Sequence, residues 1–158
     1  MRDFFKRYIP EFVYGAVDGT VTTFAVVAAS AGAGISSSVI LILGIANLIA
    51  DGFSMGSSAY LAASAEHEES VRDSQKRSSP KIIGAVTFLA FVVVGSVPVL
   101  PYLIDIIANL KAPNAVLFYV SSALTAATFL AIGFIKGKVS KQSPWQSAGI
   151  TLLLGACL

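Results

Sequence analysis

Long uncharged segments are the feature that most restricts how this chain can fold. No Asp, Glu, Lys or Arg occurs in residues 19–50, 82–104, 112–135 or 142–158. About 20 apolar residues in a helix cross the roughly 30 Å of hydrocarbon in a bilayer. Charged residues make up only 13% of the chain, about half of the roughly 25% that is usual in soluble proteins. The runs recur too often for a cleavable signal peptide, so the sequence predicts an integral membrane protein.

The spanning segments are predicted to be helices. Only helices and closed barrels satisfy all backbone polar groups inside hydrocarbon, and these runs lack the strict alternation of barrel strands. We therefore expect an all-α integral membrane protein with five transmembrane helices in a single transmembrane domain, residues 1–158. The expected spans are residues 12–30, 39–63, 82–104, 115–135 and 145–158, with a short charged insertion at 64–81. The fifth span is short for a crossing, which indicates a thinned bilayer, tilting against partners or a truncated end.

Two prolines mark a break in the third span. Pro98 and Pro101 lie near its outer end, and proline removes a backbone donor and clashes with the preceding turn. A kink or an early helix end is therefore expected there.

The positive charges predict the orientation in the membrane. Ten of the eleven Lys and Arg residues would share one side of a five-span chain: Arg2, Lys6, Arg7, Arg72, Lys76, Arg77, Lys81, Lys136, Lys138 and Lys141. Only Lys111 falls on the other side. Cytoplasmic loops carry the excess of positive charge, so the N-terminus is predicted to be cytoplasmic and the C-terminus outside. The net charge of +2 describes this asymmetry and does not indicate a nucleic-acid partner.

Polar residues interrupt the first two spans at helical spacing. Glu11, Asp18 and Thr22 lie on one face of the first span, and Asn47, Asp51 and Met55 lie on one face of the second. A carboxylate at the centre of a membrane costs about 2.5–3.5 kcal/mol on insertion scales, and such groups usually pair or line a polar pathway. Because the two spans are antiparallel, both stripes are expected to face one cavity.

These side chains form a plausible set of metal ligands. Carboxylate and amide oxygens suit hard cations, while the thioether of Met55 favours Fe²⁺ or Mn²⁺ over Mg²⁺ or Ca²⁺. Other roles stay open at this point. Asp18 and Asp51 would also serve as protonated hydrogen-bonding groups between helices, Asn47 as an interhelical hydrogen bonder and Met55 as packing. Two GxxxG pairs, Gly15/Gly19 and Gly52/Gly56, predict close helix packing in the same region.

The charged insertion holds a second group of acidic residues. Glu66, Glu69 and Asp73 would share one face of a helix, and His67 could add a nitrogen ligand. Such a cluster is either a solvated helix face or a site that captures metal at the cytoplasmic side.

Two stretches resemble a known family. YGAVDGTVTTFAVVAA at 14–29 and ADGFSMGSSAYLA at 50–62 are similar to the vacuolar iron transporter family, with a weaker likeness in PKIIGAVTFLAF and VPVLPY. The resemblance implies a five-helix homodimer that moves Fe²⁺, and often Mn²⁺, out of the cytoplasm in exchange for protons. It also implies that Asp18 and Met55 line the metal path at the dimer interface and that Glu11 lies at the cytoplasmic entrance.

The chain departs from that family in two places. Many members carry a helical cytoplasmic domain rich in Glu and Met between the second and third spans, and only the short insertion 64–81 stands here. The sequence therefore resembles a short member that lacks most of the metal-binding domain. Asn47 stands where several relatives have an acidic residue, and Asp51 is expected to replace that charge one turn later.

The expected function is export of a divalent transition metal. Metal ligands must be deprotonated, so metal and protons compete for the same carboxylates, which is the minimum for exchange. The alternatives are a proton-independent metal channel and a non-transporting module that responds to metal or recruits another chain. An enzyme is not expected, because the only His, in HEE at 67–69, lacks the second His of a zinc-protease helix.

The expected partners follow from these assignments. They are a second copy of the chain, the lipid bilayer, divalent metal ions and protons, with no permanently bound cofactor. The host membrane would be the cell inner membrane in a prokaryote or a vacuole-like organelle membrane in a eukaryote.

Overall fold

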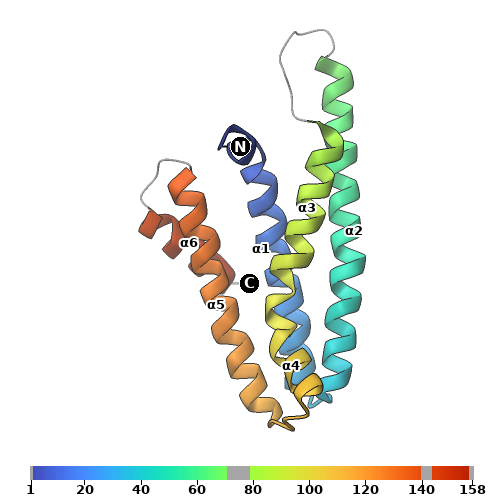
Figure 1. Cartoon of the computed structure of the whole chain (residues 1–158), viewed down its shortest axis with the longest axis vertical. Coiled ribbons are helices and arrows are strands. Elements are labelled where there is room, and N and C mark those ends of the chain that lie inside the picture. Colours follow the sequence, from blue (N-terminus) through green and yellow to red (C-terminus); the bar gives the residue numbers. More distant parts are fainter. Residues whose placement is uncertain (1, 71–78, 140–143, 157–158) are drawn as a thin grey trace.

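The described chain is a bundle of helices. The computed structural model describes residues 2–70, 79–139 and 144–156. All its regular elements are helical (Figure 1) and follow the order α1 (Arg2–Gly32), α2 (Ser37–Ser70), α3 (Pro80–Gly95), the 3-10 turn η1 (Val97–Val99), α4 (Leu100–Ala108), α5 (Asn114–Val139) and α6 (Pro144–Ala156). The predicted all-α class is confirmed.

Four segments of the described residues are long and apolar enough to cross a membrane. They are Arg7–Gly32, Ser37–Glu66, Pro80–Ala108 and Asn114–Lys138, and they correspond to the first four predicted spans. α1 begins ten residues before the predicted span 12–30, and α2 ends seven residues after the predicted span 39–63, because a helix can continue past the hydrocarbon boundary. α6 has 13 residues, a length of about 20 Å, so a crossing by the fifth segment stays a prediction.

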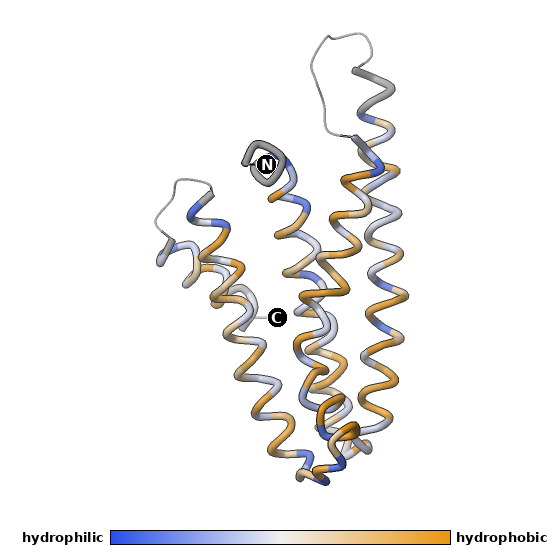
Figure 2. Tube along the Cα trace, viewed as in Figure 1, coloured by the Kyte–Doolittle hydropathy of each residue, from blue (hydrophilic) through white to orange (hydrophobic). Residues whose placement is uncertain are grey.

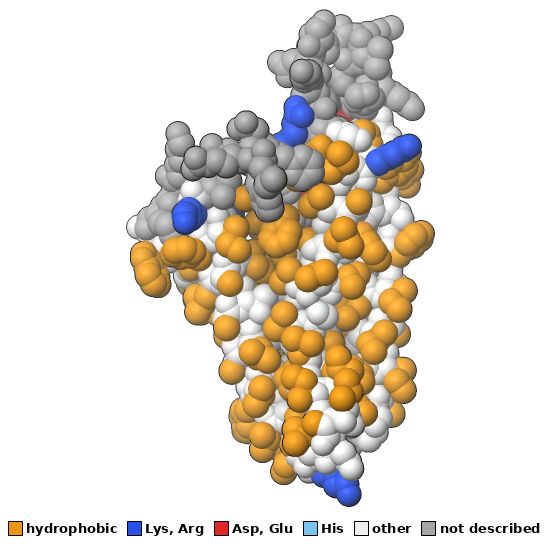
Figure 3. Space-filling view, viewed as in Figure 1, with side chains coloured by type: hydrophobic (Ala, Val, Ile, Leu, Met, Phe, Trp, Pro, Cys, Tyr) orange, Lys and Arg blue, Asp and Glu red, His pale blue; other side chains and the backbone are white. Residues whose placement is uncertain are grey.

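The surface is that of a protein surrounded by lipid. Large apolar side chains such as Phe53, Val93 and Leu153 are 70%, 65% and 66% exposed. On the face seen in Figure 3 they form a continuous band, and the basic side chains lie only at the two ends. The tube in Figure 2 is mostly white and orange in the middle of the bundle, with hydrophilic stretches at the ends and a few within α1 and α2. Exposed apolar area of this extent marks a surface in contact with lipid or protein, as expected of an integral membrane protein.

The helices alternate in direction. The start of α1, the end of α2, the start of α3 and the end of α5 lie at one end of the bundle, and the α1–α2 and α4–α5 connections lie at the other (Figure 1). The segments predicted to share the positively charged side therefore do share it. That this side is cytoplasmic remains a prediction.

Glycines bring α3 into backbone contact with both α1 and α2. A methyl group built on Gly19 of α1 would lie 2.5 Å from the carbonyl oxygen of Phe91, and one on Gly95 of α3 would lie 2.8 Å from the carbonyl carbon of Gly19. A methyl group on Gly56 of α2 would lie 3.0 Å from the carbonyl oxygen of Gly84. The two GxxxG pairs therefore allow close helix approach, as predicted. Each pair packs against α3, however, and not against the other pair.

The third span is broken where the prolines predict. α3 ends at Gly95, η1 follows, and α4 resumes at Leu100. A break inside hydrocarbon frees backbone carbonyl groups that must find new donors. The buried Ser121 hydroxyl of α5 donates to the carbonyl oxygen of Pro98 at 2.6 Å, which satisfies one of them and holds α5 against the break.

A buried carboxylate holds the connection between α4 and α5. Asp105 is 7% exposed, and its Oδ1 accepts a hydrogen bond from the backbone N–H of Ala112 at 2.9 Å. Asn109 ends α4 with a φ of 50°, in the left-handed region that closes many helices. Asp105 therefore has a structural partner at this end of the bundle.

The glycine contacts predict that alanine substitution lowers the stability at Gly19 but not at Gly32. Gly19→Ala should lower the stability by about 1–3 kcal/mol, the usual cost of overpacking, because the new methyl group meets the α3 backbone. Gly32→Ala is the matched control, since a methyl group there meets nothing within 4 Å and alanine favours helix. Thermal unfolding in detergent compares the two. Equal midpoints for the two variants would contradict the assigned α1–α3 contact.

Candidate metal-binding site

The polar face of α1 carries Glu11, Asp18 and Thr22. All three side chains are half-buried. The hydroxyl of Thr22 donates to the backbone carbonyl of Asp18 at 2.9 Å, so it is satisfied within its own helix. The Oε2 atom of Glu11 is buried, and no described residue donates a hydrogen bond to it. An orphaned buried acceptor is costly, and a cation or a water molecule would satisfy it.

Asn47 connects the polar face of α2 to that of α1. Its amide nitrogen lies 3.4 Å from the hydroxyl oxygen of Thr22 and 3.3 Å from that of Thr23, within donating distance of both. The two predicted stripes therefore meet. Asn47 acts as an interhelical hydrogen bonder through its nitrogen, and only its carbonyl oxygen is left for a metal.

Asp18 and Asp51 belong to the two helices that this contact joins. Their carboxylates lie close enough for their charges to interact. Asp18 is half-buried, whereas Asp51 is exposed on the surface of a single copy. Both positions fall near the middle of candidate spans, Arg7–Gly32 and Ser37–Glu66. Two carboxylates at mid-membrane repel each other when ionised, and a divalent cation between them would remove that repulsion.

Met55 lies one turn beyond Asp51 and has a packing role. It is partly buried against the core cluster that includes Leu48, Phe91 and Tyr102. Packing and ligation are compatible for a flexible thioether, so a ligand role for its sulfur stays a prediction. Among the described residues, no three His, Cys, Asp or Glu side chains converge on one point. A complete ligand set within one copy therefore has to include amide, thioether or backbone donors.

The predicted acidic cluster of the insertion is only partly described. Glu66 is exposed near the end of α2, and Glu69 belongs to the same helix. The side chain of Glu69 and the whole of Asp73 lie outside the residues that the structure describes in detail. Capture of metal by these residues stays a prediction.

The site predicted from the sequence does not include a stripe of small residues that lies beside Asp51. Five exposed positions on α2, each four residues from the next, carry only Ala or Ser: Ala46, Ala50, Ser54, Ser58 and Ala62. Small residues at this spacing allow another helix to approach closely. The spacing is visible in the sequence, but exposure is not, and exposure is what makes the stripe a surface.

The comparisons with known proteins identify a family for this chain. The model of the VIT family matches residues 9–80 and 66–158. A protein named "Vacuolar iron transporter" from Toxoplasma gondii is 46% identical over 61 residues, which are 39% of this chain and 20% of that protein. One of the same name from Plasmodium berghei is 32% identical over 71 residues, 45% of this chain and 26% of that protein. These matches confirm the resemblance drawn from the sequence.

A plant relative is matched over nearly the whole chain. "Vacuolar iron transporter 2" from Oryza sativa subsp. japonica is 26% identical over 207 aligned positions, which cover 94% of this chain and 82% of that protein. Because this chain has 158 residues, the plant protein carries additional residues inside the aligned region. The chain spans only about a fifth to a quarter of the two apicomplexan relatives.

Proposed function

Because the chain belongs to the VIT family, we propose that it transports divalent iron, and Mn²⁺ by the same path, across its membrane. The observation that carries this proposal is the pair of carboxylates, Asp18 and Asp51, near the middle of two candidate spans whose helices are joined by the hydrogen bonds of Asn47. Ionised groups at that depth are costly unless they are paired or line a pathway. A transported cation supplies the missing partner.

The ligand chemistry favours a transition metal. Asp18, Asp51 and the Asn47 carbonyl offer oxygen, and Met55 offers a polarisable sulfur one turn away. Sulfur ligands select against Ca²⁺ and Mg²⁺, whereas mixed oxygen and sulfur sites accept Fe²⁺. Glu11, two helical turns before Asp18, has a buried oxygen without a donor among the described residues. It would bind the ion at the entrance on the positively charged, cytoplasmic side.

Export in exchange for protons follows from competition at the same oxygens. A carboxylate must lose its proton before it binds metal. A neutral cytoplasm therefore favours metal binding, and an acidic compartment on the other side favours protonation and release. Each unit of pH difference contributes about 1.4 kcal/mol per exchanged proton. In a eukaryote, an acidic vacuole-like organelle would provide this difference.

The transporting unit is proposed to be a homodimer. In a single copy Asp51 is exposed, so lipid would contact its carboxylate. The neighbouring Ala and Ser stripe, from Ala46 to Ala62, allows a second copy to pack closely against α2. Packing of two copies along this face would enclose both aspartate pairs in one polar pathway.

The test is metal flux into proteoliposomes that contain the purified chain. Fe²⁺ and Mn²⁺ influx should be several times faster when the receiving side is acidic by two pH units than when the pH is equal, and Ca²⁺ should not compete. Liposomes without protein give the background. Flux that ignores the pH gradient would contradict proton exchange and favour a channel. Folded protein that moves neither metal would contradict transport itself.

A further inference from the structure

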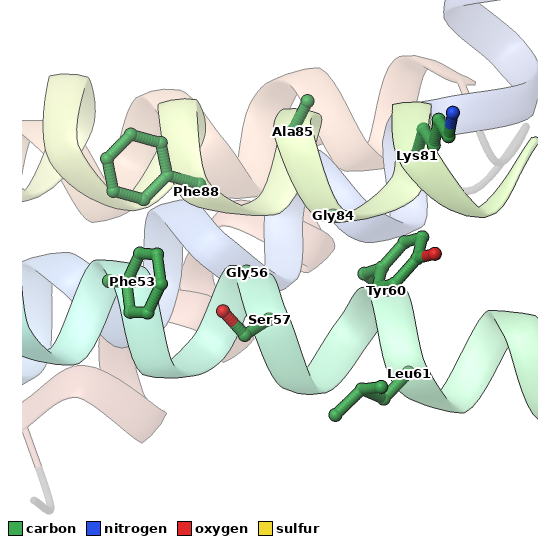
Figure 4. A pocket seen from close by; sticks show the side chains of 9 residues that line it. All are labelled: Phe53, Gly56, Ser57, Tyr60, Leu61, Lys81, Gly84, Ala85 and Phe88. Atoms are coloured by element: carbon green, nitrogen blue, oxygen red, sulfur yellow. The ribbon is translucent and has the colours of Figure 1, made fainter.

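An apolar groove runs between α2 and α3 on the outside of the bundle. Its volume is about 580 Å³. Figure 4 shows residues that line it, with α2 below and α3 above: Phe53, Gly56, Tyr60, Lys81, Gly84, Ala85 and Phe88. The proposed metal path lies between α1 and α2, and none of its residues lines this groove.

Two glycines set the shape of the groove. Gly56 and Gly84 bring α2 and α3 into contact, because a methyl group on Gly84 would lie 2.7 Å from the carbonyl oxygen of Gly56. Both glycines line the furrow, which runs along this crossing. Phe53 and Phe88 border one end of it (Figure 4). The surface that lines the furrow is almost wholly apolar.

A cation and a phenol stand at the other end. Lys81 of α3 and Tyr60 of α2 both lie at that end (Figure 4), and Lys81 is exposed in the first turn of α3. A lysine at this position adds its charge to the positive end of the helix dipole. The combination favours an anion, and it lies at the end of the bundle that carries most of the positive charge.

We propose that this groove binds a phospholipid with an anionic headgroup from the cytoplasmic leaflet. One acyl chain would lie in the furrow between Phe53 and Phe88, and the phosphate would bind the ammonium group of Lys81 and the hydroxyl of Tyr60. Basic pockets between spans at the cytoplasmic side are suited to anionic headgroups. The apolar furrow adds the requirement for an acyl chain, which a free phosphate ion cannot meet. This inference does not rest on the proposed transport.

In the experiment, lipid is titrated into the purified chain in detergent, and binding is monitored through the unfolding temperature of the protein. Phosphatidylglycerol should raise the midpoint at lower concentration than phosphatidylcholine, and inorganic phosphate should have no effect. Lys81→Gln should weaken the apparent affinity for phosphatidylglycerol about fivefold, which corresponds to about 1 kcal/mol. Lys81→Arg should restore it. Ala85→Phe, which adds a ring at the α3 border of the furrow and keeps the cation, should weaken binding of both lipids.

The matched control is Lys138→Gln, which removes an exposed cation at the same end of the bundle but outside the groove. It should leave the titration unchanged. If Lys81→Gln and Lys138→Gln lose equal affinity for phosphatidylglycerol, the lipid is attracted by the positive charge of this end as a whole, and the proposed site is wrong. Equal effects of phosphatidylcholine and phosphatidylglycerol on the wild-type chain would overturn the role of the headgroup. An Ala85→Phe chain that unfolds at the wild-type temperature yet binds both lipids normally would overturn the role of the furrow.

Discussion

Asp18→Asn is expected to reduce Fe²⁺ flux at least about a hundredfold. Groups that only support a metal ligand are already worth about 10- to 100-fold in affinity or activity, and Asp18 would be a ligand itself. Asparagine keeps the shape of the side chain and removes the charge. The measurement is the initial rate of Fe²⁺ influx into proteoliposomes with an acidic interior.

The same substitution should not destabilise the fold. An ionised carboxylate near the middle of a span is costly without a partner, so replacing it by a neutral amide removes that cost in the metal-free chain. Thermal unfolding without metal should therefore occur at the same temperature or a higher one. A carboxyl group that served as hydrogen-bonding glue between helices would give the opposite pair of results, retained flux with reduced stability. That outcome would contradict the ligand role.

Asp105→Asn provides the matched control. Asp105 is also an aspartate within a candidate span, but its Oδ1 already accepts the N–H of Ala112 and it lies near the α4–α5 connection. Asparagine keeps an acceptor for this N–H but loses the charge, and a hydrogen bond contributes about 1.5–3 kcal/mol with a charged group but only about 0.5–1.5 kcal/mol with a neutral one. This variant should therefore lose about 1 kcal/mol of stability while its flux remains measurable. Loss of flux in both variants at equal protein levels would remove the distinction between a ligand and a structural carboxylate.

Ser54→Trp is expected to break the proposed homodimer. Ser54 is exposed at the centre of the Ala and Ser stripe, three residues from Asp51. Helices associate in membranes through close packing of small residues, and an indole on this surface prevents that approach. We expect monomers where the wild type forms dimers, at least about a tenfold weaker association, and a parallel loss of metal flux. Light scattering in detergent measures the mass of the assembly, and single-molecule photobleaching in liposomes counts the copies in it.

Ile49→Trp is the control for added bulk on the same helix. Ile49 is 62% exposed and lies five residues before Ser54, on a different face of α2. This variant should keep the wild-type mass and flux. A Ser54→Trp chain that remains dimeric would exclude the stripe from the interface. A monomeric Ser54→Trp chain with full flux would show that one copy suffices for transport.

Part of the site could be predicted from spacing alone. Asp18 and Asp51 stand out because charged residues are rare in spans, and their helical spacing to Thr22 and Asn47 places each stripe on one face. Antiparallel neighbours then have to meet, and the hydrogen bonds from Asn47 to Thr22 and Thr23 show that they do. The role of Asn47 itself was open in the sequence, since an amide is both a ligand and a hydrogen bonder.

Other features could not be predicted. Gly15 and Gly19 were expected to bring polar helices together, but they contact α3. The spacing of residues in the sequence also does not predict that Asp51 is exposed or that a groove lies beside Lys81. These features depend on where a third helix packs, and α3 is separated in sequence from α1 by the whole of α2.

The sequence by itself determined the helical class, the four long spans and the break at Pro98 and Pro101. The helical class and the spans follow from one local constraint, because backbone polar groups in hydrocarbon need hydrogen-bond partners and a helix supplies them within the segment. The break follows from the missing N–H and the ring of proline. Only the tertiary structure decided which face of each helix is buried. Lipid chains are as apolar as a protein interior, so hydrophobic patterning does not distinguish the packed face from the lipid-facing one. Steric fit at Gly19, Gly56 and Gly95 decides it instead.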